Sequence, residues 1–77
     1  MSKTFSGKIV IKILIKYFRF ILVSQKGSHC KLKRMAGDDI DTTIVPLHKE
    51  LAMGTLKGIL KLGNVEFDEF MKVAKKN

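Results

Sequence analysis

The stretch FILVSQKGSHCKLKR, residues 20–34, decides the fold that we expect for this 77-residue chain. Its first six residues, Phe20 to Gln25, are rich in side chains that favour strands. Gly27 follows and can adopt the positive φ that a tight hairpin turn requires. The residues after it alternate, with Cys30 and Leu32 on one face and His29, Lys31 and Lys33 on the other. We therefore predict a β-hairpin whose second strand covers residues 29–34.

A helix is predicted on the N-terminal side of this hairpin. Ser6 can cap a helix that begins at Gly7. Apolar side chains then share one helical face: Ile9, Val10, Ile13, Leu14 and Tyr17. Lysines recur every four residues as a polar stripe, Lys8, Lys12 and Lys16, which favours a helix over a strand. Further apolar residues, Ile11, Ile15 and Phe18, are either core or a contact for another protein.

A third strand is predicted on the C-terminal side. Residues 36–39 (AGDD) read as a second turn. Thr42 to Leu47 then form a strand that ends near Pro46. Three strands joined by short turns make an antiparallel meander, which can leave one face open to solvent.

Two short helices complete the chain. The first follows a Thr55 cap and stops at Gly63, with Leu56, Ile59 and Leu60 at helical spacing. The second starts at Asn64 or a neighbour, and its apolar face carries Phe67, Phe70, Met71 and Ala74. We therefore predict a single α+β domain over residues 1–77, in the order α-β-β-β-α with the last helix broken in two. A three-stranded antiparallel sheet would carry the helices on one face.

The charge is distributed unevenly along the chain. Residues 1–37 hold nine lysines and arginines and no acid, whereas residues 38–77 hold six bases and seven acids, so that 9 − 1 gives the net charge of +8. Such a field favours a polyanionic partner, with nucleic acid first and an anionic membrane surface second. The plainer interpretation is a soluble basic surface. A surface-bound membrane helix is the weakest option, because residues 9–18 lack tryptophan and are needed for the core.

Several classes of protein are excluded. Cys30 is the only cysteine, which rules out an internal disulfide and a zinc cluster and fits a reducing cytoplasm. Lys12, Lys16 and Arg19 interrupt the apolar N-terminal stretch and argue against a signal peptide or a membrane-spanning helix. The acids Asp38, Asp39 and Asp41 lack the fuller oxygen set of a calcium loop. No phosphate-binding glycine loop or serine nucleophile elbow is present, which argues against nucleotide-dependent enzymes and serine hydrolases. We expect no metal and no cofactor.

His29 is the strongest candidate for chemistry. It follows the glycine turn and lies on the strand face of Lys31 and Lys33. An imidazole can give or take a proton near neutral pH, and ammonium groups can hold a phosphodiester. The plainer interpretation is an exposed histidine on a basic strand. His48 and Lys49, just past the third strand, could reach the same face or be merely solvated.

Several segments together resemble one family. They are residues 6–12 (SGKIVIK), 25–29 (QKGSH), 45–51 (VPLHKEL), 54–61 (GTLKGILK) and 66–70 (EFDEF). In order and spacing they resemble the HicA-type toxins of bacterial and archaeal toxin–antitoxin pairs, over nearly the whole chain. Arg19 departs from the family, which usually has glycine there, and Cys30 occupies a variable position.

The resemblance implies a double-stranded-RNA-binding-domain-like fold and a metal-independent ribonuclease that cuts messenger RNA and stops growth. A HicB-type antitoxin would hold it inactive, and an oligomer within that complex is allowed. The resemblance makes His29 the catalytic residue, acting as general base or general acid, with Gly27 and Ser28 in the same motif.

Lysines near that motif would bind RNA phosphates: Lys26, Lys31 and Lys33. His48 and Lys49 are further candidates for RNA contact. Two alternatives stay open: a non-catalytic RNA-binding module of the same fold, and an interaction protein that docks through its apolar first helix.

Overall fold

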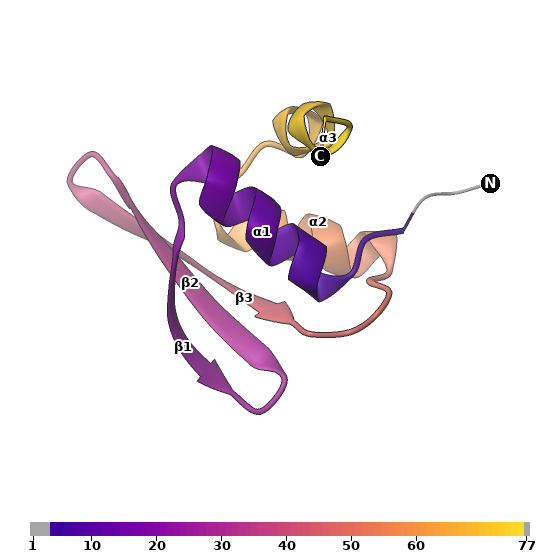
Figure 1. Cartoon of the computed structure of the whole chain (residues 1–77). Coiled ribbons are helices and arrows are strands. Elements are labelled where there is room, and N and C mark those ends of the chain that lie inside the picture. Colours follow the sequence, from indigo (N-terminus) through magenta and orange to yellow (C-terminus); the bar gives the residue numbers. More distant parts are fainter. Residues whose placement is uncertain (1–3, 77) are drawn as a thin grey trace.

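A computed structural model describes residues 4–76 (Figure 1). Its elements are α1 (Gly7–Phe18), β1 (Ile21–Lys26), β2 (His29–Ala36), β3 (Asp39–Pro46), α2 (Met53–Leu62) and α3 (Phe67–Ala74). The strands form one antiparallel sheet in the order β1-β2-β3. The predicted α+β fold, in the order α-β-β-β-α with a split last helix, is confirmed.

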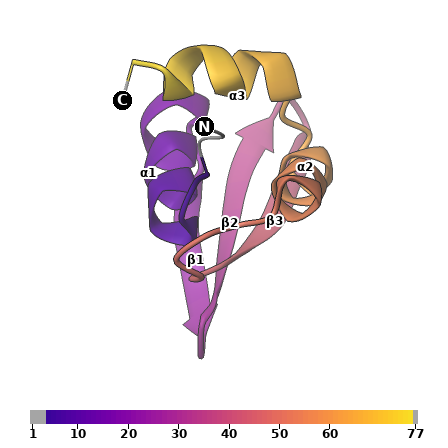
Figure 2. The same ribbon diagram turned by 90° about the vertical axis from the view of Figure 1, so that its right-hand side faces the viewer.

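The helices cover one face of the sheet and leave the other open. The β2 register pairs Cys30 with Val45 and Leu32 with Thr43, and all four side chains are buried beneath the helices. Helices α1 and α2 both contact β3, and α3 lies across the end of these two helices (Figure 2). The alternate residues of β2, which begin with His29, face solvent on the other side. We call that side the open face.

Helix α1 forms as its sequence predicts. The Ser6 hydroxyl accepts a hydrogen bond from the Ile9 amide at 3.1 Å, so the predicted cap is confirmed. Val10, Ile13 and Leu14 are fully buried in the core. Ile9 is 38% exposed, which places it at the margin of the buried stripe.

The turns set the strand lengths. Gly27 and Gly37 both have positive φ, 59° and 65°, and each begins a two-residue turn. The turn at Gly37 is tighter than predicted, so β2 runs on to Ala36 and β3 starts at Asp39. Leu47, predicted to lie in the third strand, instead follows β3, where its amide donates to the Ser28 carbonyl at 2.6 Å.

The start of α2 differs from the prediction. The N-cap is Ala52, which makes no side-chain capping bond, so the predicted Thr55 cap is wrong. An isolated β-bridge pairs Phe5 with Leu51, the residue before the N-cap. The N-cap therefore lies at Ala52, three residues before Thr55. Tertiary pairing therefore overrides the local capping preference.

The end of α2 is at Gly63, as predicted, for a different reason. The left-handed conformation belongs to Asn64, whose φ is 59°, and not to Gly63. A Cβ atom at Gly63 would lie 3.2 Å from both Phe20 and Thr43, so glycine lets these two buried residues pack closely against the end of the helix. α3 then begins at Phe67.

Arg34 connects four parts of the fold. Its Nε donates to Asp41 on β3 at 2.9 Å, in the one ion pair found among residues 4–76. Its Nη1 donates to the Phe18 carbonyl at the end of α1 at 3.3 Å, and its Nη2 donates to the Asn64 carbonyl at 2.9 Å. The guanidinium also lies 4.8 Å from the centre of the Phe20 ring. One side chain thus ties β2 to its neighbours.

Replacing Arg34 with lysine should destabilise the fold. A lysine ammonium keeps the charge but lacks the planar fork that reaches three acceptors at once. We expect Arg34→Lys to lower the free energy of unfolding by about 2 kcal/mol, which corresponds to roughly 10 °C in Tm. Thermal unfolding followed by circular dichroism measures it. The matched control is Arg19→Lys at an exposed arginine, which should change stability by less than about 0.5 kcal/mol. Equal effects of the two changes would contradict the role given to Arg34.

The Gly27 turn gives a second prediction, with a control of opposite sign. Gly27→Ala meets no neighbouring atom but forces a side chain into positive φ, which should cost about 1–2 kcal/mol. Gly58→Ala also enters open space, within α2, and should stabilise by up to about 1 kcal/mol because alanine favours helix. Urea unfolding of both variants checks the signs. A stabilising Gly27→Ala would mean that the turn does not require positive φ.

Candidate nucleic-acid interface

His29 is the first residue of β2 and lies on the open face. It pairs with Lys26 across the hairpin and with Pro46 on β3. Its side chain is exposed, and the alternation of β2 keeps it on the same face as Lys31.

A hollow of about 280 Å³ surrounds His29. The residues that line it come from all three strands: Ser24, Lys26, His29, Lys31 and Ile44. The structure therefore brings three predicted site residues together, His29 with Lys26 and Lys31. Ser24 and Ile44 were missed, because both reach the hollow through their pairing with Lys31 and neither belongs to a motif. We call this the histidine hollow.

Lys33 lies one step farther along the same face. It follows the alternation of β2 and lines a neighbouring hollow instead of the one at His29. Among residues 4–76, no carboxylate is within ion-pair distance of Lys26, Lys31 or Lys33. The described residues thus leave the positive charge of the open face without a neutralising carboxylate.

The hairpin turn at the histidine hollow is held from two sides. The Gln25 side chain donates to the Gly27 carbonyl at 3.1 Å, and the Leu47 amide donates to the Ser28 carbonyl. Both bonds fix the two turn residues that precede His29. The turn is therefore positioned before any ligand binds.

The start of α1 holds the segment of residues 46–48, which in turn contacts the hairpin turn. The Gly7 amide donates to the His48 carbonyl at 2.9 Å. A side chain at Gly7 would overlap the Pro46 carbonyl, so only glycine allows this approach. α1 thereby fixes the segment that holds the hairpin turn.

His48 and Lys49 occupy a different place from the one we expected. Both are exposed and line a separate hollow of about 320 Å³, together with Ser6, Lys8 and Leu47. The structure does not bring them into the histidine hollow. They still extend the basic surface beyond the hairpin turn. His48 directly follows Leu47, whose amide is bonded to the Ser28 carbonyl of that turn.

Within residues 4–76, no three histidine, cysteine, aspartate or glutamate side chains are grouped so that they could hold a metal ion. No helix in that range is long and apolar enough to cross a bilayer.

Comparison with known proteins places this site in a family. The model of the family described as "HicA toxin of bacterial toxin-antitoxin" matches residues 7–64, from the start of α1 to just past the end of α2. No curated protein and no solved structure matches the chain. The match covers the whole sheet, including the histidine hollow, and the family implies an antitoxin partner. The chain thus belongs to the HicA toxin family of toxin–antitoxin systems.

Proposed function

We propose that this toxin is a metal-independent endoribonuclease that binds messenger RNA on its open face and cuts it with the help of His29. A HicB-type antitoxin would hold it inactive. The observation that supports the proposal most directly is the histidine hollow, where one imidazole lies between two lysines that no carboxylate of residues 4–76 neutralises.

The chemistry requires few groups from the protein, because RNA supplies its own nucleophile. The 2′-oxygen forms a bond to phosphorus as its proton leaves, and the bond from phosphorus to the 5′-oxygen breaks as that oxygen gains a proton. His29 would carry out one of these transfers, as general base or as general acid. The ammonium groups of Lys26 and Lys31 would stabilise the negative charge that develops on the phosphoryl oxygens.

The neighbouring residues would position the RNA. Lys33 continues the row of positive charge along β2. Gly27 and Ser28 form an exposed turn with open space at Gly27, which would allow a phosphate to approach the backbone. His48 and Lys49 would contact the RNA beyond the turn, in their own hollow.

One observation favours a non-catalytic RNA-binding module instead. Among the described residues, no side chain makes a hydrogen bond to His29 that would orient its imidazole, whereas many catalytic histidines have such a partner. In that case His29 would be one RNA contact among several, and its loss would have little effect.

RNA cleavage in the presence of EDTA tests the proposal. We expect His29→Ala to lower the cleavage rate by about 10²- to 10⁴-fold, since one proton transfer is lost, while circular dichroism shows an unchanged fold. Lys61→Ala is the control for cleavage, because this exposed side chain is on α2, which packs on the opposite face of the sheet. Equal cleavage by the parent and His29→Ala would remove His29 from the mechanism. Binding of RNA without cleavage by either protein would establish the non-catalytic module.

The dependence of RNA binding on salt tests the phosphate contacts separately. Lys31→Ala should weaken binding of single-stranded RNA and reduce the slope of log affinity against log salt by about 0.7. Lys61→Ala serves as control, because this exposed lysine is on α2, which packs on the opposite face of the sheet. An unchanged slope for Lys31→Ala, measured by fluorescence anisotropy, would mean that Lys31 does not contact phosphate.

A further inference from the structure

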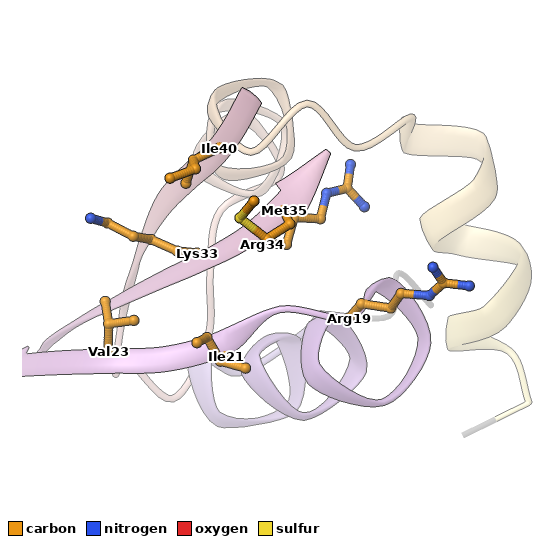
Figure 3. A pocket seen from close by; sticks show the side chains of 7 residues that line it. All are labelled: Arg19, Ile21, Val23, Lys33, Arg34, Met35 and Ile40. Atoms are coloured by element: carbon orange, nitrogen blue, oxygen red, sulfur yellow. The ribbon is translucent and has the colours of Figure 1, made fainter. Parts of the chain in front are cut away.

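The open face carries a second hollow, distinct from the histidine hollow and made of apolar side chains. Its floor consists of Ile21 and Val23 from β1, Met35 from β2 and Ile40 from β3 (Figure 3). It has a volume of about 440 Å³, within the range of sites that bind ligands or anchor side chains. We call it the apolar hollow.

An irregularity in β1 separates the two hollows. Leu22 pairs with Leu32 and Ser24 pairs with Lys31, so Val23 is an extra residue in a β-bulge. Because of it, the adjacent residues Val23 and Ser24 serve different hollows: Val23 the apolar one and Ser24 the histidine one. Because of the bulge, β1 contributes residues to both hollows on the same face.

The apolar hollow is not part of the core. Met35 is 71% exposed and Ile40 is 57% exposed, and both lie on the face of the sheet that no helix covers. Exposed apolar side chains gathered from three strands mark an interaction site more often than an ordinary surface.

The rim of this hollow is basic. Arg19, Lys33 and Arg34 line it beside the apolar floor, and Lys31 lies two residues before Lys33 on the same strand. None of the residues that line either hollow is an acid. A second copy of the chain would bring like charges together, and the net charge of +8 opposes that contact.

The lining also argues against a nucleobase as the occupant. The hollow is lined by no aromatic side chain on which a base could stack. Its floor also has no neutral polar group that could form hydrogen bonds with the edge of a base. A flat bilayer surface would rest on the rim and leave the hollow between the side chains of the three strands unfilled. An apolar side chain flanked by carboxylates fits both the floor and the rim.

We propose that the apolar hollow binds an apolar side chain of an acidic polypeptide partner, whose carboxylates pair with Arg19 and Lys33. The chemistry of the hollow suits the antitoxin that the family implies. Peptide binding is measured without RNA, so it succeeds or fails independently of the ribonuclease proposal.

The probes are nine-residue peptides with a central leucine, phenylalanine or tryptophan flanked on both sides by glutamates, and the same peptides with lysines in place of the glutamates. The protein is labelled with ¹³C at its methionine methyl groups. Met35 reports on the hollow, while Met53 on α2 and Met71 on α3 are internal controls. We expect at least one acidic peptide to shift the Met35 signal to saturation and the basic peptides to leave it unchanged.

Two substitutions of similar exposure test the location. Ile40→Ser should weaken binding of the acidic peptide at least tenfold while Met35 still reports. Leu62→Ser should leave it unchanged, because Leu62 is 62% exposed on α2. A Met35 signal that responds to no acidic peptide, or equally to the basic ones, overturns the proposal. The proposal is also overturned if the Met35 signal shifts with protein concentration, with an RNA oligonucleotide or with anionic phosphatidylglycerol vesicles instead of with the acidic peptides.

Discussion

The guanidinium of Arg34 is the constraint on which the arrangement of this small domain depends. Its donors reach Asp41, the end of α1 and the loop after α2, so the helices are tied to the middle strand by one planar group. Side chains alternate along a strand, and placing Arg34 on the helix side therefore places His29 and every second residue after it on the open face. A slip of one residue would exchange the two sets. The ion pair thus sets the register of the basic face as well as stabilising the fold.

The position of His29 depends on a second, more distant constraint. Gly7 approaches the Pro46 carbonyl closely enough that no side chain fits, and its amide is bonded to His48. The next residue back, Leu47, is bonded to the turn that precedes His29. The N-terminus of α1 therefore acts on the histidine hollow without touching it. A substitution at Gly7 would displace the hairpin turn through the 46–48 segment.

Local patterns predicted most of the fold. The period of α1, the Gly27 turn and the alternation of β2 are each encoded within a few neighbouring residues, and each prediction is confirmed. The Gly37 turn is an error of local strand length, whereas the errors at α2 and at the site concern long-range pairing. The bridge between Phe5 and Leu51 shifts the start of α2 away from Thr55, and the partners of Lys31 reach the site only through the register of the sheet. A β-bulge has no fixed sequence signature, so the division of the open face was not predictable.

That division gives the open face two kinds of binding chemistry. Around His29 the ligand would be held mainly by charge. Salt screens this attraction, and the release of counterions from the RNA dominates the binding free energy. Around Met35 and Ile40 it would be held mainly by apolar contact, which salt does not screen. Lys33 lies between the two, so a carboxylate of a polypeptide and a phosphate of RNA would both be attracted to its ammonium and would repel each other there. A polypeptide anchored in the apolar hollow would therefore compete with RNA for a shared lysine before it reached the imidazole.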